Sequence, residues 1–153
     1  MAKGTQTAPI TLHLRRTVPA PRERVFQAWT RPEDLKRWAG PGDLTTPLAE
    51  VDLRVGGRYR IHMQAPDGTL HRVAGTYREV VPPEKLVYTW AWEEKPEEGE
   101  TLVTVEFLDR GRGTEVVLTH ERFPNAAVRD RHEHGWGGCL DKFGALFASP
   151  GLS

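Results

Sequence analysis

The middle of the chain, from about Leu44 to Arg122, alternates between apolar and polar residues almost without interruption. Alternation with a period of two is typical of strands that bury one face, and short turn sequences between such runs are typical of hairpins. The sequence APDGT at residues 65–69 is a clear example of these turns. The pattern predicts about six consecutive strands in one antiparallel sheet, whose apolar face another element must cover.

One long helix is predicted to cover that sheet. It begins after Asn125, a residue type that caps helices well, and runs to Ala148. Earlier in the chain, residues 10–18 alternate like a further strand, and residues 20–30 and 30–40 have the apolar spacing of two short helices. The expected fold is therefore α+β, with a curved antiparallel sheet of about six or seven strands around a long C-terminal helix and two short helices after the first strand.

Length and composition indicate a single domain. A chain of 153 residues with 38% hydrophobic and 27% charged residues is ordinary for one globular domain. We expect this domain to span residues 10–148, with a disordered segment at 1–9 and a tail at 149–153. The formal net charge of zero argues against nucleic-acid binding, and no apolar run approaches the ~20 residues that span a bilayer. A single cysteine and a start without a signal-like apolar segment predict a cytoplasmic protein.

The hairpin turns predict which residues lie opposite each other, and therefore which residues share the inner face of the sheet. We expect the pairs Met63 with His71, Ile61 with Val73, Tyr59 with Gly75, Val103 with His120 and, across a four-residue turn after Val81, Tyr77 with Trp90 and Gly75 with Trp92. In this register the aromatic residues of the central strands face inward. Gly75 is then expected to leave a dent between Tyr59 and Trp92.

The C-terminal helix carries more glycines than a stable helix needs. Its sheet-facing stripe contains Trp136, Leu140 and Phe143, and Gly137 and Gly144 lie along one border of that stripe. Each interior glycine costs a helix ~1 kcal/mol relative to alanine, so the missing side chains require a reason. Two readings remain open: close packing against residues 25–29, or an empty space between the helix and the sheet.

An empty space is geometrically natural here, because a twisted sheet curls away from a straight helix. A gap lined by aromatic residues with few polar groups is a site for a small apolar or aromatic molecule. A tyrosine hydroxyl and His120 would orient such a ligand, and no cofactor, metal site or catalytic residue is predicted. The residues expected to bind the ligand are Tyr59, Met63, Val73, Tyr77, Trp90, Trp92, Val103, Val105, Leu118, His120, Trp136, Leu140 and Phe143.

Two histidine features have alternative readings. His120 is either a buried histidine satisfied by a backbone carbonyl or a general base in the cavity. His132 and His134 resemble a metal cluster, but residues two apart on a helix point in different directions and cannot share an ion. The only serines, Ser149 and Ser153, fall in the tail, which argues against a serine hydrolase.

The outer face of the sheet is predicted to be rich in arginine. Arg58, Arg60 and Arg72 fall on this face by the same alternation. Most simply it is a solvated surface. The alternative is a docking patch for an acidic protein partner, because arginine binds carboxylates in a two-pronged geometry.

Several segments together resemble a known superfamily. They are APRERVFQAWTRPEDLKRWAGP, DLRVGGRYRIHM, GTYREVVPPEKLVYTW, GTEVVLTHERFP and HGWGGCLDKF. In this order the chain resembles the SRPBCC (START-like, helix-grip, Bet v-type) superfamily over residues 10–148, and most closely the branch of activator of heat-shock-protein ATPase homologues. The resemblance implies a curved sheet gripping a long helix around a cavity. It leaves three functions open: a small-molecule carrier, a protein-binding module for a chaperone, and an enzyme such as a cyclase or hydrolase.

Overall fold

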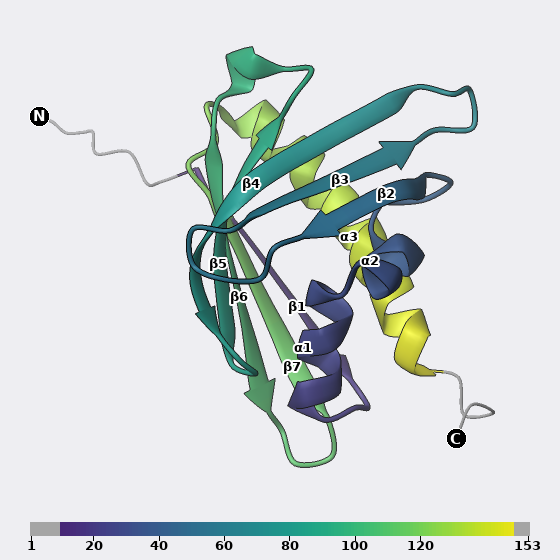
Figure 1. The fold of residues 1–153 in the computed structure, drawn as a ribbon, viewed down its shortest axis with the longest axis vertical. Helices are drawn as coiled ribbons and strands as arrows, with labels where there is room; N and C mark the ends of the chain where they lie inside the picture. The colour runs from purple at the N-terminus through teal and green to yellow at the C-terminus, as the bar shows by residue number, and fades with distance from the viewer. Residues whose placement is uncertain (1–9, 149–153) are drawn as a thin grey trace, which may run out of the picture.

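The computed structural model describes residues 10–148, so the expectations for residues 1–9 and 149–153 lie outside the described residues. Within residues 10–148 the chain forms one seven-stranded antiparallel sheet, three α-helices and a short 3-10 helix (Figure 1). In chain order the elements are β1 (Leu12–Val18), α1 (Arg22–Thr30), α2 (Pro32–Trp38), β2 (Thr45–Val51), β3 (Arg58–Gln64), β4 (Leu70–Val81), β5 (Lys85–Trp92), η1 (Pro96–Glu98), β6 (Thr101–Asp109), β7 (Thr114–Glu121) and α3 (Ala126–Ala148).

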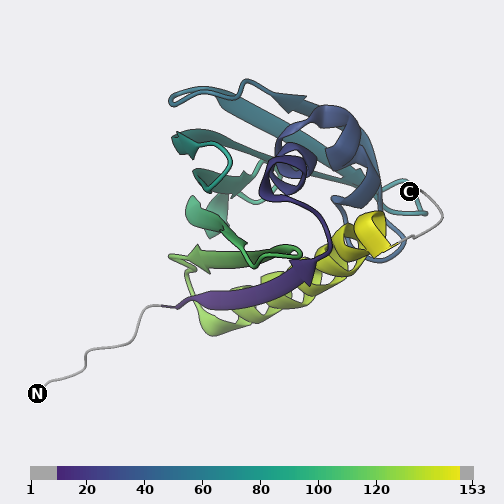
Figure 2. The same ribbon diagram turned by 90° about the horizontal axis from the view of Figure 1, so that it is seen from below.

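The strands are ordered β1-β7-β6-β5-β4-β3-β2, so the first two strands of the chain form the two edges of the sheet. The sheet curves strongly, and Figure 2 shows it wrapped around α1 and α2, with α3 beside β1. Helix α3 packs against the edge strand β1, and α2 packs against the other edge, β2. The three helices therefore close the open side of the curved sheet. This is the helix-grip architecture that the sequence predicts.

The long helix begins where the sequence places its cap. The side-chain Oδ1 of Asn125 accepts a hydrogen bond from the backbone N–H of Val128 at 2.9 Å, which satisfies one of the donors that a helix start leaves free. Helix α3 then runs through Ala148. The predicted cap and extent of this helix are confirmed.

Two of the three predicted hairpin registers are confirmed. Tyr59 lies opposite Gly75 in the β3–β4 pair, and Val103 lies opposite His120 in the β6–β7 pair. The predicted register of the β4–β5 pair is wrong, because Tyr77 lies opposite Tyr88 and Trp92 lies opposite Val73. The turn is one residue shorter than expected, with Val81 paired to Lys85, and an irregularity between Tyr77 and Glu79 inserts one extra residue in β4. The shorter turn and the bulge together shift the register by two residues, which is an even number. The aromatic side chains therefore still face inward.

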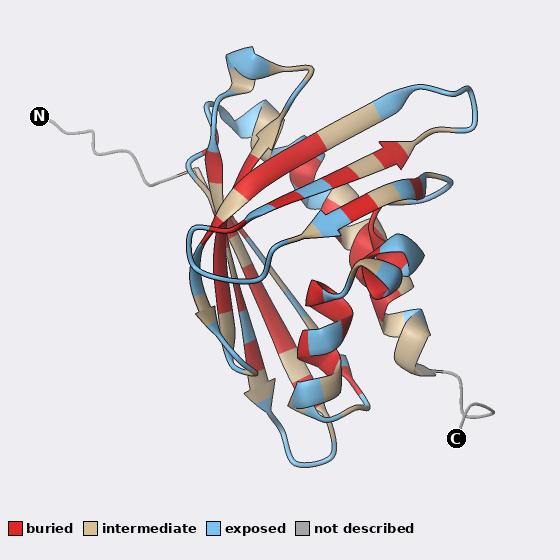
Figure 3. Ribbon diagram, in the orientation of Figure 1, coloured by how far each residue is buried: buried red, intermediate tan, exposed pale blue. Residues whose placement is uncertain are grey.

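The inner face of the sheet is buried along most of its length, as Figure 3 shows for the central strands. No dent exists at Gly75. A Cβ added there would overlap the carbonyl oxygen of Thr89 and lie 2.7 Å from Cε2 of Tyr59. The Tyr59 ring crosses this glycine, and its hydroxyl donates a hydrogen bond to the Thr89 carbonyl at 2.6 Å. Gly75 therefore allows a close approach instead of leaving space.

Candidate ligand-binding site

A cavity of about 200 Å³ lies between the concave face of the sheet, the two short helices and the first half of α3. All five tryptophans of the chain line it, together with all three tyrosines. Such a concentration of aromatic side chains makes the wall largely apolar. The lining residues are Trp29, Leu35, Trp38, Ala39, Pro41, Leu44, Tyr59, Ile61, Met63, His71, Tyr77, Tyr88, Trp90, Trp92, Arg131, His132, Gly135, Trp136 and Cys139.

Six of the thirteen residues predicted to bind a ligand line this cavity. They are Tyr59, Met63, Tyr77, Trp90, Trp92 and Trp136. The other seven lie in the packed core and not among the lining residues: Val73, Val103, Val105, Leu118, His120, Leu140 and Phe143.

Helix α1 explains this division, because its aromatic residues fill the half of the sheet formed by β6 and β7. The ring of Phe26 meets Phe107 of β6 edge to face at 5.4 Å, and Trp29 packs 6.0 Å from the same ring. Phe143 of α3 then packs 5.1 Å from Trp29 and 5.0 Å from Trp38. The cavity is left only beside β3, β4 and β5.

Sequence reasoning missed the contribution of α1, α2 and the loop that follows α2. Trp29, Leu35, Trp38 and Leu44 all line the cavity. A signal was present, because Leu35 and Trp38 share one face of α2, as expected for residues three apart. That face was not assigned to the cavity, since nothing local in the sequence shows which side of the sheet the two short helices cover.

The glycines of α3 have other neighbours than expected. A Cβ added at Gly138 would lie 2.8 Å from Cβ and 3.3 Å from Cα of Pro41, so this glycine permits close packing of the loop after α2. Gly135 lines the cavity near the same proline. Gly137 has open space around it, and Gly144 lies beside Arg16 of β1. Neither reading of Gly137 and Gly144 is confirmed, because neither glycine lines the cavity and neither packs against residues 25–29.

Lys142 holds the same loop in place from the next turn of α3. Its Nζ donates hydrogen bonds to the carbonyl oxygens of Gly40, at 2.6 Å, and Leu44, at 3.0 Å. The loop that carries Pro41 and Leu44 to the cavity is therefore fastened to α3 by one close contact and two charge-assisted hydrogen bonds.

His120 is fully buried and both of its ring nitrogens have protein partners. The indole N–H of Trp136 donates to Nδ1 at 3.0 Å, so the proton of the neutral ring is on Nε2. Nε2 lies 2.6 Å from the hydroxyl of Thr101, which in turn donates to the carbonyl of Trp90 at 3.1 Å. Burial, and secondarily the neighbouring His132, hold the pKa of His120 well below its usual value. His120 thus acts as a structural acceptor and has no nitrogen free for a guest.

His132, which lines the cavity, is bonded in a similar way. Its Nδ1 donates to the carbonyl of Val128 at 2.8 Å, and its Nε2 accepts the indole N–H of Trp92 at 2.7 Å. Burial lowers the pKa of His132. His134 is exposed on the other side of the helix. The two histidines therefore point apart, and within the described residues no group of three or more potential ligands could hold a metal ion.

Among the described residues that line the cavity, Arg131 is the one permanently charged side chain, and it is exposed. Arg131 lines the mouth, and its guanidinium binds both carboxylate oxygens of Glu98 at 2.7 and 2.8 Å. This pair ties η1 in the acidic β5–β6 loop to α3. Deeper inside, burial raises the pKa of the Cys139 thiol to about 11, so it remains protonated and behaves as a small apolar side chain.

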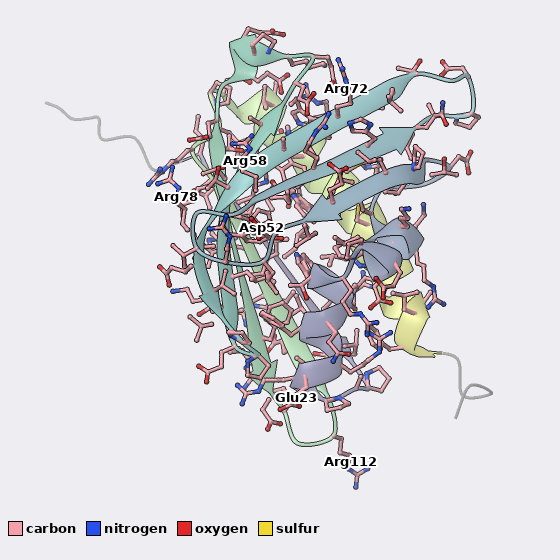
Figure 4. All side chains as sticks on the ribbon, in the orientation of Figure 1. Glu23, Asp52, Arg58, Arg72, Arg78 and Arg112 are labelled. Carbon is pink, nitrogen blue, oxygen red and sulfur yellow. The ribbon has the colours of Figure 1, made fainter. Side chains whose placement is uncertain are left out.

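The arginines of the outer face lie along β3 and β4, where Figure 4 labels Arg58, Arg72 and Arg78. Glutamates accompany most of them. Arg60 lies 3.5 Å from Glu93, and Arg72 lies 3.7 Å from Glu94. Arg58 instead donates to the hydroxyl of Thr76 at 3.2 Å and forms no ion pair with a residue in the described range. The surface is therefore of mixed charge, and exposed pairs of this kind contribute little to stability.

These features define a class: a helix-grip protein with a small aromatic pocket between its sheet and its helices. The sequence profile described as activator of Hsp90 ATPase homolog 1-like protein matches residues 19–148. The chain therefore belongs to this family. Within residues 10–148, no helix is both long and apolar enough to cross a bilayer.

Solved structures agree with this assignment. A protein from Chromobacterium violaceum is 30% identical, with a TM-score of 0.84 over 91% of this chain and 97% of that one. An AHSA1 protein from Silicibacter pomeroyi is 26% identical, with a TM-score of 0.81 over 90% and 97%. An AHSA1-like protein from Aeromonas hydrophila is 28% identical, with a TM-score of 0.75 over 94% and 95%. A comparison with curated proteins returned no match.

Proposed function

We propose that the protein binds a small, mostly apolar aromatic molecule in the cavity beneath Trp136. The observation that carries this proposal is a cavity of about 200 Å³ whose wall contains every tryptophan and tyrosine of the chain. An engineered apolar cavity of about 150 Å³ takes up benzene. A cavity of this size therefore fits one aromatic ring with a short substituent. The expected compartment is the cytoplasm, which the single buried thiol of Cys139 supports.

Blocking the mouth provides the test. Leu44 lines the cavity and is half-buried, so Leu44→Trp places a large side chain in the mouth or the cavity itself. Leu53 is exposed and is not among the lining residues, so Leu53→Trp is the matched control. We expect indole or naphthalene to shift the tryptophan indole NMR signals of the wild type and of Leu53→Trp, but not of Leu44→Trp. If no aromatic probe binds the wild type, and native mass spectrometry of protein from its own host shows no bound molecule, the proposal is wrong.

The family description favours a second candidate, a protein-binding module that engages a chaperone. Arg58 supports it, since this cation on the outer face has no carboxylate partner in the described range. Arg58→Glu together with Arg60→Glu and Arg72→Glu is expected to abolish capture of an acidic chaperone partner, whereas Arg110→Glu, at the far β6–β7 turn, should leave it unchanged. Equal capture by all variants would overturn this second candidate.

A further inference from the structure

Two tyrosine hydroxyls and one indole N–H in the cavity wall have protons that no described residue accepts. Tyr77 is 4% exposed and lines the cavity, and its hydroxyl forms no hydrogen bond with any residue in the range 10–148. Tyr88 accepts the indole N–H of Trp29 at 3.1 Å, but its own proton has no acceptor in that range. Over the same range, Nε1 of Trp90 is the one fully buried polar side-chain atom without a partner. The hydroxyl of Tyr77 is not among these fully buried atoms, so it is open to the cavity and free to bond a guest, and the unused proton of Tyr88 offers a second donor at the same wall.

The neighbouring polar groups do not supply that missing acceptor. The hydroxyl of Tyr59 is already used, because it donates to the carbonyl of Thr89. The nitrogens of His120 and His132 accept from Trp136 and Trp92. His71 also lines the cavity, but its side chain is 40% exposed and lies beside Glu94, six residues along β4 from Tyr77. A guest that uses the hydroxyl protons of Tyr77 and Tyr88 therefore needs an oxygen or nitrogen with a free lone pair in the space beside these two residues.

Charge limits the choice further. Arg131, the one permanently charged side chain among the described residues of the wall, is exposed and is already bound by Glu98. Burying an unpaired carboxylate or ammonium is strongly unfavourable. Burial also raises the pKa of Tyr77 and of Tyr88, so both remain protonated donors at physiological pH. An interior of this kind accepts an uncharged guest.

We infer that the guest is a neutral aromatic carbonyl compound, whose oxygen accepts hydrogen bonds from the hydroxyls of Tyr77 and Tyr88 while its ring packs among the tryptophans. The two tyrosines lie opposite each other in the β4–β5 pair, with ring centroids 5.9 Å apart, so both side chains border the same part of the cavity. A carbonyl oxygen has two lone pairs and can accept from more than one donor. This inference rests on the proposed function, since it names the class of molecule for the same cavity.

Two probes of the same shape separate the carbonyl from the ring. Acetophenone carries C=O where α-methylstyrene carries C=CH₂, and benzoate adds a negative charge. Titrations followed by the indole NMR signals are expected to give acetophenone a Kd about four- to hundredfold lower than that of α-methylstyrene, because each of the two net hydrogen bonds contributes a factor of about two to ten. Benzoate is expected to bind more weakly than both.

Phenylalanine substitutions test whether the hydroxyls of Tyr77 and Tyr88 cause the preference for acetophenone. Tyr77→Phe and Tyr88→Phe should each reduce the advantage of acetophenone, and the double variant should remove it without changing the Kd of α-methylstyrene. Tyr59→Phe is the matched control and should keep the advantage, because that hydroxyl is already bonded to Thr89. Should the double variant fail to fold, Tyr77→Phe decides alone, since it gives up no hydrogen bond to the described protein.

The outcomes distinguish the carbonyl preference of the cavity from its ability to bind a ligand at all. If α-methylstyrene binds the wild type as tightly as acetophenone does, or if the Phe variants keep the preference, the carbonyl inference is overturned while the ligand-binding function stands. If neither probe binds the wild type, the carbonyl inference is overturned. The ligand-binding function fails with it only if indole and naphthalene also do not bind and no molecule co-purifies.

Discussion

Alanine at Gly138 is expected to destabilise the protein, whereas alanine at the adjacent Gly137 is expected to stabilise it. Both glycines lie inside α3, so both substitutions gain the same intrinsic helix propensity, ~1 kcal/mol. They differ in what the new methyl group meets. At Gly137 nothing lies within 4 Å of the added Cβ, whereas at Gly138 the added Cβ would lie 2.8 Å from Cβ of Pro41.

The magnitudes follow from this difference. Gly137→Ala should raise the free energy of unfolding by ~1 kcal/mol, which corresponds to a Tm about 2–4 °C higher for a domain of this size. At Gly138 the backbone of Pro41 is also close, at 3.3 Å, so the loop must move as a whole. Overpacking of this kind costs about 1–3 kcal/mol, and subtracting the propensity gain leaves a net loss of about 0–2 kcal/mol.

Urea unfolding followed by tryptophan fluorescence measures both variants against the wild type. The decisive quantity is the difference between the two alanine variants, about 1–3 kcal/mol, because the helix propensity cancels in it. Equal stabilisation by both alanines would refute the reasoning, since it would mean that Pro41 does not pack closely on α3. The loop after α2 would then not be positioned as the wall of the cavity.

Two further predictions concern buried polar groups. In the folded protein the pKa values of His120 and His132 lie below their ordinary value of 6.5. As the pH falls below 6.5, the unfolded chain therefore binds protons at these histidines that the folded protein does not bind. The free energy of unfolding should therefore be highest above pH 6.5 and fall as the pH is lowered from 7.5 to 5.5, by up to ~1.4 kcal/mol per pH unit per histidine. His132→Gln should flatten this dependence and His134→Gln, at an exposed position, should not; a wild-type stability that does not fall over this range contradicts the argument. Lys142→Met should lower the free energy of unfolding by about 1–3 kcal/mol in urea titrations, because the carbonyls of Gly40 and Leu44 lose their donor, while exposed Lys36→Met should change it little. Equal losses in the two lysine variants would show that the loop is not held by Nζ.

The sequence predicted well those features that depend on residues close together in the chain, namely strands, tight turns and a helix cap. The alternation identified the strands, the turn APDGT at residues 65–69 gave the correct β3–β4 register, and Asn125 marked the start of α3. These features depend on residues close together in the chain. The predicted β4–β5 register was wrong because the turn after Val81 has three residues and not four, and because β4 contains a bulge beside Tyr77. A bulge has no clear signature in the residues that form it.

The candidate site was predicted less completely. Trp136, Trp90 and Tyr77 were assigned to the inner face from periodicity, and they line the cavity. Periodicity equally assigned Phe143 and Leu118, which are packed in the core. A face of a strand or helix can be inferred from its pattern, but the pattern does not show whether that face meets another side chain or a space.

The sequence by itself determined the order of the elements, the antiparallel sheet and the aromatic character of its inner face, because these follow from local spacing and turn chemistry. Only the tertiary structure decided where the cavity lies, which glycine of α3 receives Pro41, and which polar groups remain without partners. These depend on how α1 and α2 pack across the sheet, and the packing of helices against a curved sheet is set by side chains from distant parts of the chain acting together.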